Sequence, residues 1–342
     1  MEQLRFLIGN EKRFSDYISS LAYAKRVVIV SHTDLDGIAS AKVVDEVVEA
    51  DVRLFVNYTD LNDNLVQKLK DLEVSHVIFT DLFIKREFVE KVAKFAFVLV
   101  IDHHISGEDF NSDNIVFLNA QGVCASYICY YLFSKIQNLS KIDWLVACAC
   151  ISDFCYTSIW NWMEEVCMKY GESFKGGMIE NVNSGKIWDI QWKLVLSLLS
   201  FKDVKEAYYK IGTEFGDIGD LDKNYFVVQK EFDNVLSRFE KEKGSILEGY
   251  FWEISSDSTI KAILINFLSA KEANKTFIFA SGKEDKYNIS ARRQDGKINM
   301  KELLQRLIIG FDHSDAGGHF RAAGGSIILK DKEEFLRRLN EL

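Results

Sequence analysis

The 342-residue sequence contains no proline, although average usage is about 5%. This absence excludes cis-proline turns and proline starts of helices, and it removes one signal that marks where elements end. No apolar run reaches the roughly 18 residues of a membrane-spanning helix. The N-terminus also lacks the apolar stretch after a basic start that is typical of a secretory signal. We therefore expect a cytoplasmic protein that does not enter a membrane.

Basic residues are in the minority, with 42 Lys and Arg against 51 Asp and Glu, a net charge of -9 and a pI of about 5.3. Such an acidic chain is not a general nucleic-acid-coating protein. It can still hold a short phosphate polymer through metal ions and a local basic patch. The six cysteines form no CxxC pair, which favours reduced, mostly buried thiols, with a zinc site as the alternative. They are Cys124, Cys129, Cys148, Cys150, Cys155 and Cys167.

The chain has 48% hydrophobic and 27% charged residues, as in ordinary globular proteins, and its length favours two domains. An amphipathic helix is predicted over residues 4–23. Between residues 26 and 136, short apolar runs alternate with helical patterns, which is typical of a doubly wound α/β domain with a mainly parallel sheet. Helices dominate residues 157–245.

Near residue 244 the pattern changes to a smaller α/β domain with alternating strands and two helices. A glycine-dense loop over residues 310–325, a strand over 326–329 and a final helix are expected to complete it. We therefore predict a first α/β domain at 1–200, a helical linker at 201–244 and a second, smaller α/β domain at 245–342.

Several apolar runs end in polar side chains that can bind metals or protons. The run 97–101 ends in Asp-His-His, two earlier runs end in His-Thr-Asp-Leu-Asp and Thr-Asp, and a later one, interpreted as a helix, ends in Ser-Asp. The carboxyl ends of parallel strands meet at one edge, so these side chains are expected to converge. So many carboxylates repel one another unless cations neutralise them. We predict a divalent metal site, with two ions bridged by one carboxylate, formed from His32, Asp34, Asp36, Asp81, Asp102, His103, His104 and Asp153.

The spacing of His32, Asp34 and Asp36 would put all three on one side of an extended segment. Their mixture of imidazole and carboxylate suits manganese, magnesium, iron or zinc, and the carboxylate majority favours manganese or magnesium. A plain turn is the alternative, because Asp-x-Asp-Gly is common turn chemistry. Of His103 and His104, which point to opposite faces of a strand, one is expected to bind metal. The other is free to contact a phosphate or donate a proton, unless the pair is a surface dipeptide.

Two stretches in the second domain suit anion binding. Glycines there let the backbone approach a ligand closely, and basic side chains follow them. Arginines before the loop can bind phosphate through two nitrogens, although a solvated charge remains the alternative. The predicted substrate-binding residues are Arg293, Gly317, Gly318, His319 and Arg321.

These motifs, in this order, resemble the DHH phosphoesterase superfamily with a DHHA1 C-terminal domain, over about residues 25–155 and 245–330. The family contains RecJ-type exonucleases, nano-RNases and phosphodiesterases for cyclic or linear dinucleotides. The resemblance implies an active site in the cleft between the two domains. The aspartates lie two and four residues after His32, which is closer to the RecJ-like and archaeal branch than to nano-RNases, where they lie four and six residues after.

The resemblance also implies a role for each matching residue. His32 and Asp34 would bind a first metal ion, Asp36, His103 and Asp153 a second, and Asp81 would bridge the two. Asp102 would support the adjacent histidine, and His104 would face the substrate. The implied catalytic residues are thus His104, Asp102 and Asp81, while Arg293 and His319 would hold the substrate phosphate or nucleotide.

The predicted function is a metal-dependent phosphodiesterase or exonuclease that converts short or single-stranded oligonucleotides to mononucleotides by two-metal hydroxide attack. Two Mn2+ ions are expected, with Mg2+ as the alternative. The expected partners are short single-stranded RNA or DNA, or dinucleotides. A homodimer or a replication or repair partner stays open. The alternatives are an inactive scaffold subunit of a nucleic-acid-processing assembly, and a pyrophosphatase or polyphosphatase.

Overall fold

The computed structural model describes residues 3–104, 106–172, 184–246, 248–254, 260–318 and 320–341. The chain divides into two compact units, residues 1–225 and 226–342. The division falls in helix α11 (Leu221–Glu242), inside the segment predicted to be a linker. Both units combine helices and strands, so the predicted α/β class is confirmed. None of the helices within these ranges is long and apolar enough to cross a membrane.

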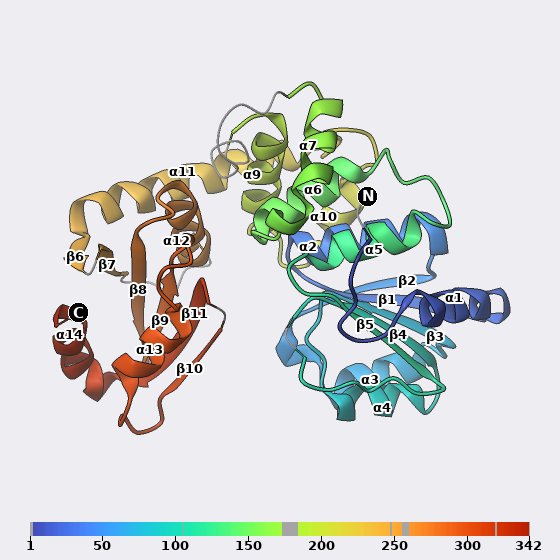
Figure 1. Ribbon diagram of the computed structural model, residues 1–342, viewed down its shortest axis with the longest axis horizontal. Coiled ribbons are helices and arrows are strands. Elements are labelled where there is room, and N and C mark those ends of the chain that lie inside the picture. The colour runs from blue at the N-terminus through green and yellow to red at the C-terminus, as the bar shows by residue number, and fades with distance from the viewer. Residues whose placement is uncertain are drawn as a thin grey trace. The chain divides into compact units, whose positions relative to one another are not determined.

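The first unit is built on a five-stranded sheet in the order β2-β1-β3-β4-β5, with every pair parallel as predicted (Figure 1). Strands β1, β3, β4 and β5 are short and mainly apolar because both of their faces are buried, whereas the edge strand β2 is only half-buried. Ile29 and Ile78 face one core, whereas Val28 and Val77 face the other. The strand bounds are β1 Val27–His32, β2 Val52–Val56, β3 His76–Thr80, β4 Phe97–Asp102 and β5 Ile115–Asn119.

Helices cover both faces of this sheet. One face is covered by α2 (Leu35–Val48) and α5 (Ala125–Phe133), the other by α3 (Asp63–Asp71) and α4 (Arg86–Ala93) (Figure 1). A further helical layer lies on the α2 side, where α6 contacts both α2 and α9. Its helices are α6 Asp143–Ser152, α7 Trp160–Lys169, α9 Lys186–Leu198 and α10 Val204–Lys210.

The first helix is shorter than the predicted 4–23. Helix α1 spans Glu11–Ser20, and a single 3-10 turn follows it. Before it, Ile8 forms a β-bridge with Asn119, and Gly9 has a φ of +75°. A side chain at residue 9 would meet the Phe117 carbonyl, so glycine and the sheet edge together override the amphipathic pattern.

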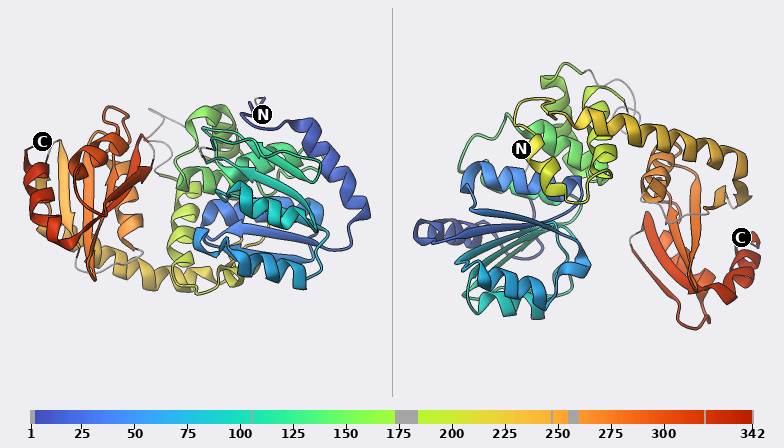
Figure 2. Two further views of the ribbon diagram at one scale, coloured as in Figure 1. Left: turned by 90° about the horizontal axis from the view of Figure 1, so that it is seen from below. Right: turned by 180° about the vertical axis from the view of Figure 1, so that it is seen from behind.

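The second unit is a six-stranded mixed sheet in the order β10-β11-β9-β8-β7-β6, in which only the β7–β8 pair is parallel. Phe239 of α11 contacts Trp252 and Phe279 on one face of the sheet. Leu304 and Phe335 belong to the core on the opposite face. Helices lie against both faces of this sheet (Figure 2). The elements are β6 Gly244–Ile246, β7 Gly249–Glu253, α12 Ile260–Lys271, β8 Thr276–Lys283, β9 Lys286–Arg292, α13 Met300–Ile308, β10 Asp315–Gly318, β11 Ala322–Ile328 and α14 Lys332–Asn340.

The glycine-dense loop predicted over residues 310–325 is wrong for most of its length. Strands β10 and β11 form an antiparallel hairpin in which Gly317 pairs with Gly324 and Gly318 with Ala323. The last strand therefore starts at Ala322 rather than at residue 326. Glycine and alanine have low strand propensity, but pairing with β9 supplies the backbone partners that propensity alone does not reveal.

Candidate metal centre

The register of three neighbouring strands brings the predicted polar residues to one edge of the sheet. Ser31 pairs with Thr80, and Thr80 pairs with Ile101. His32, Asp81 and Asp102 come next in the sequence, so they leave the sheet at the same level. Beneath them, the hydroxyl oxygens of Ser31 and Thr80 lie 2.7 Å apart. The convergence expected from the apolar runs is confirmed.

Asp34 and Asp36 reach this edge by a different route from the predicted extended segment. Asp34 is the N-cap of α2, where its Oδ1 accepts a hydrogen bond from the Gly37 N–H at 3.0 Å, and Asp36 lies in the first helical turn. The helix can start this close to β1 because Gly37 has no side chain. A Cβ there would lie 2.4 Å from the His32 carbonyl oxygen. The prediction that these residues alternate along an extended chain is therefore wrong, although the residues still gather.

The first ligand cluster consists of His32, Asp34 and Asp81. His32 Nδ1 lies 2.9 Å from Asp34 Oδ2 and 3.6 Å from Asp81 Oδ2. His32 Nδ1 and Asp81 Oδ2 are buried and make these ion-pair contacts, but neither forms a well-aligned hydrogen bond with the described residues. Buried polar atoms that are only partly satisfied are costly unless a cation binds them. The donor set of one imidazole and two carboxylates therefore fits a divalent ion.

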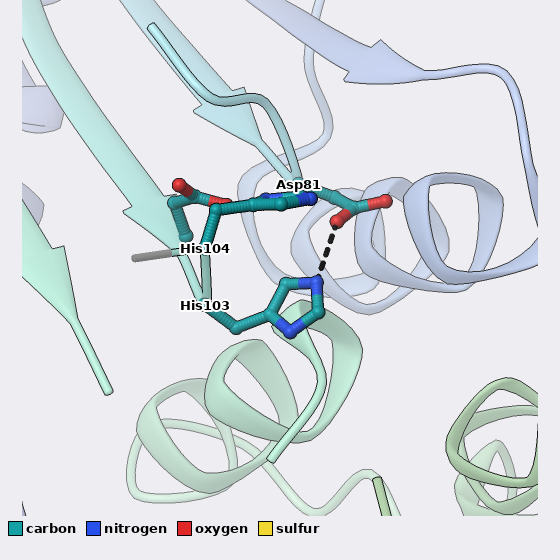
Figure 3. A group of neighbouring side chains, drawn as sticks. Asp81, His103 and His104 are labelled. Carbon is teal, nitrogen blue, oxygen red and sulfur yellow. Dashed lines mark hydrogen bonds and ion pairs between the residues drawn. The ribbon is translucent and has the colours of Figure 1, made fainter. Parts of the chain in front are cut away.

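The second cluster surrounds His103, whose Nε2 faces the Asp81 carboxylate (Figure 3). This nitrogen lies 3.3 Å from Asp81 Oδ1, 3.5 Å from Asp153 Oδ2 and 3.8 Å from Asp36 Oδ2. Asp81 thus turns one oxygen toward His32 and the other toward His103, as a bridging carboxylate would. Asp81 also has a φ of +58°. Left-handed backbone is strained for aspartate, and such strain concentrates at functional sites.

Asp36 has a structural role that the sequence did not reveal. Its Oδ2 accepts the Ala125 N–H at 2.8 Å, and its Oδ1 accepts the Ser126 N–H at 2.9 Å. The buried carboxylate therefore anchors the N-terminus of α5, where the helix dipole favours negative charge. A carboxylate oxygen keeps a second lone pair, so the ligand role of Asp36 stays a prediction.

Asp102 supports His104 rather than the adjacent His103. Asp102 Oδ1 lies 2.7 Å from His104 Nδ1, and the Tyr58 hydroxyl lies 3.1 Å from His104 Nε2. The Tyr58 ring also stacks on His32, with ring centroids 4.8 Å apart. Sequence reasoning missed Tyr58. Its position two residues beyond β2, at the same edge of the sheet, is the signal that could have found it.

The electrostatics of the centre favour cations. Burial and the charges of Asp36 and Asp34 raise the pKa of Asp81 and of Asp153 well above the ordinary range. Burial would lower the pKa of His32, but its contacts with Asp34 and Asp81 raise it to about 10. Burial would also lower the pKa of His103, but its interaction with Cys155 and the charges of Asp36 and Asp153 raise this pKa to about 10. In the metal-free protein, the raised pKa values favour protons on these imidazoles and carboxyls, and the protons offset the excess negative charge that metal ions would otherwise neutralise.

The C-terminal unit gives its two adjacent arginines different surroundings. The Arg293 side chain is buried, and its guanidinium contacts Asp295 at 2.8 Å and Glu248 at 2.9 Å. The positive charge of Arg293, which was predicted to bind substrate phosphate, is therefore paired with these two carboxylates. Arg292, which the sequence offered beside Arg293 as a possible phosphate ligand but which was not among the predicted substrate-binding residues, donates to the Asn266 side chain and to the carbonyls of Ala291 and Ala323.

Arg292 makes no ion pair with a carboxylate among the described residues, and burial lowers its pKa to about 10. It lies on β9 beside the glycine hairpin, where it pairs with Ala322. Gly317, Gly318 and Arg321 of the hairpin are exposed, and His319 lies outside the described residues. Arg292 is therefore the better candidate for an anion-binding residue.

Two protein-family models match the chain, one in each of its two units. A model of the DHH family, N-terminal domain, matches residues 26–152, and a model of the DHHA1 domain matches residues 249–342. The chain joins a DHH domain to a DHHA1 domain. The resemblance of the motifs is thus confirmed, and the family supports a phosphoesterase. No curated protein matches the sequence.

Solved structures share the fold of this DHH–DHHA1 chain at low identity. A DHH-domain structure named as a member of the s1p family of ribosomal proteins is 13% identical, with a TM-score of 0.70, covering 97% of this chain and 89% of that one. Exonuclease RecJ bound to manganese is 14% identical, with a TM-score of 0.64 and coverages of 99% and 94%. The pGpG-specific phosphodiesterase PggH from Vibrio cholerae is 14% identical, with a TM-score of 0.53 and coverages of 93% and 98%.

The raised pKa values predict how pH affects the stability of the metal-free protein. A histidine whose pKa rises from 6.5 to about 10 on folding stabilises the fold fully below pH 6.5, and this contribution is lost as the pH rises toward 10. The raised pKa values of Asp81 and Asp153 act in the same direction. A divalent ion replaces these protons, so the stabilisation by metal should grow with pH.

This is measured as the difference in Tm between metal-loaded and chelated protein from pH 6.5 to about 8.5. The difference should widen with pH in the wild type and be largely absent in Asp81→Asn. A difference that narrows as the pH rises would contradict the assignment.

Proposed function

We propose that this chain is a metal-dependent phosphodiesterase that hydrolyses short single-stranded oligonucleotides or dinucleotides to mononucleotides. The observation that carries the proposal is the pair of ligand clusters that share Asp81 at the carboxyl edge of the parallel sheet. Two divalent ions held there would neutralise phosphoryl oxygens and lower the pKa of an attacking water. His32, Asp34 and Asp81 would hold one ion, and His103, Asp153 and Asp81 the other.

The neighbours support the substrate class. RecJ is an exonuclease with manganese bound, and PggH is a phosphodiesterase specific for pGpG, so both act on phosphodiester bonds. The net charge of -9 opposes binding of long nucleic acid, because affinity for a phosphate backbone grows with the number of cations it meets. A short substrate requires few such contacts. We therefore favour oligonucleotide ends and dinucleotides, with Mn2+ or Mg2+ as the ion.

The Asp102–His104–Tyr58 chain is suited to proton transfer. Asp102 Oδ1 accepts a hydrogen bond from the His104 Nδ1–H. This bond favours the proton on Nδ1 and leaves Nε2 directed at the Tyr58 hydroxyl. When protonated, His104 can give the Nε2 proton to the leaving oxygen of a phosphodiester. The Tyr58 hydroxyl lies beside this nitrogen and could itself donate to a phosphoryl oxygen. Burial and the carboxylates raise the pKa of Tyr58, so the phenol stays protonated.

The first test is release of mononucleotide from labelled RNA and DNA oligomers of about two to about twenty nucleotides with Mn2+. We expect the highest activity on the shortest oligomers and at least a 100-fold loss (order of magnitude) in Asp81→Asn. Asp16→Asn, which removes an exposed carboxylate of α1, should match the wild type.

Processive digestion of the longer DNA would instead support an exonuclease of the RecJ kind. If the metal-loaded protein hydrolysed no oligomer, the proposal would fail. Assays with pyrophosphate and polyphosphate would then separate those activities from a scaffold without activity.

Replacing Asp102 by Asn tests the proton-transfer chain. The amide cannot hold the His104 proton as a carboxylate does, so kcat on a dinucleotide should fall by about 100-fold or more. Tyr58→Phe keeps the ring that stacks on His32 and removes only the hydroxyl, so a loss within about 10-fold is expected. An Asp102→Asn enzyme with an unchanged kcat and pH profile would show that His104 takes no part in proton transfer.

The adjacent arginines offer a matched pair for substrate binding. Arg292→Ala removes the cation without a carboxylate partner together with its hydrogen bonds to Asn266, Ala291 and Ala323, so KM for a dinucleotide should rise by about 10- to 100-fold, alongside some loss of Tm. Arg293→Ala leaves Asp295 and Glu248 without their cation, so the free energy of unfolding should fall by about 1–3 kcal/mol with KM nearly unchanged. The opposite pattern would restore Arg293 as the substrate-binding residue.

A further inference from the structure

One cysteine of the chain lies among the predicted metal ligands. Cys155 is half-buried, whereas the other five cysteines are buried. Its Sγ lies within 4.8 Å of ligand atoms of His103 and Asp153, so the three residues form a group able to hold an ion. Neither the sequence motifs nor the family match, which ends at residue 152, gives this residue a role.

The backbone around Cys155 is shaped so that two potential ligands separated by one residue, Asp153 and Cys155, both reach His103. Helix α6 ends at Ser152, Asp153 caps it, and the Cys155 N–H donates to the Cys150 carbonyl at 2.9 Å. Between the two ligands, Phe154 has a φ of +55°. A left-handed backbone conformation is energetically costly for a non-glycine residue. The strain is stored where the chain must turn Asp153 and Cys155 toward the same imidazole.

We propose that Cys155 is a ligand of the second metal ion, together with His103, Asp153 and Asp81, and raises the affinity of this position for Co2+, Zn2+ or Fe2+ relative to Mn2+ and Mg2+. The inference rests on the metal centre proposed above and assigns its second position. A thiolate is a soft ligand, whereas manganese and magnesium favour oxygen. One sulfur, one nitrogen and two carboxylates form a donor set that zinc and cobalt accept in four-coordinate sites.

The two positions of the centre are then chemically unequal. The first, with His32, Asp34 and Asp81, offers only nitrogen and oxygen, and the described residues place no sulfur in that group. Asp81 would join a harder position to a softer one. The thiol proton is replaced by the ion on binding, as at other cysteine metal sites.

The neighbouring thiols provide a control. Cys124 and Cys150 have their Sγ atoms 3.1 Å apart, and Cys124 also contacts the Ser126 hydroxyl. Both are fully buried, and neither belongs to a ligand group among the described residues. If sulfur binds the ion, Cys155 rather than Cys150 should supply it.

The test is titration of Co2+ into the metal-free full-length protein, followed by absorption spectroscopy. We expect the wild type and Cys150→Ala to show visible cobalt bands together with a near-ultraviolet thiolate-to-cobalt charge-transfer band. Cys155→Ser should keep the visible bands and lose the charge-transfer band. In competition titrations, its preference for Zn2+ over Mn2+ should fall by about 10-fold or more. Cys155→Asp, which offers oxygen at the same place, should shift the preference further toward Mn2+.

The outcomes separate this inference from the proposed metal centre. Cobalt binding by the wild type without a charge-transfer band, or a band that persists in Cys155→Ser, overturns the role of Cys155 and leaves the metal centre intact. Failure of the wild type to bind Co2+, Zn2+ or Mn2+ overturns both. Far-ultraviolet circular dichroism checks that each variant is folded, and the Asp variant gives an independent result if the Ser variant is not.

Discussion

The charge of Asp81 is the constraint on which the N-terminal unit depends. This carboxylate is buried at the edge of the sheet, with Asp34, Asp36 and Asp153 near enough to raise its pKa. Two imidazoles approach it from opposite sides, but one of its oxygens has no hydrogen-bond partner among the described residues. Such an arrangement is costly unless cations occupy it. The fold therefore sacrifices some stability to keep a strongly negative site at the carboxyl ends of the parallel strands.

The surrounding elements hold these charges in place. Gly37 lets α2 begin against β1, which brings Asp34 and Asp36 to the centre. Asp36 in turn fixes the N-terminus of α5 through two backbone amides. Asp36 thus links α2 to α5 and also contributes negative charge to the metal centre. This coupling explains why the polar edge and the helical layer above it form a single structural unit.

The adjacent arginines show why a residue type alone does not define a binding role. Arg292 and Arg293 differ by one position, but only Arg293 meets carboxylates. Arg292 is surrounded by neutral acceptors, so its charge remains available for an anion. The same reasoning separates Cys155 from the buried pair Cys124 and Cys150, because accessibility and neighbours decide which thiol can meet an ion.

Local sequence determined much of this protein. Short apolar runs specified the parallel strands, because a strand buried on both faces leaves no position for polar residues, and the residues that end those runs specified His32, Asp81, Asp102 and His103 as neighbours. Only the tertiary structure decided the partners of those residues. Helix α2 rather than an extended chain carries Asp36, Tyr58 reaches His104 from another strand, and Glu248 reaches Arg293 from far along the chain. Periodicity reports the faces of an element, whereas contacts between distant segments depend on register and burial that no single stretch of sequence contains.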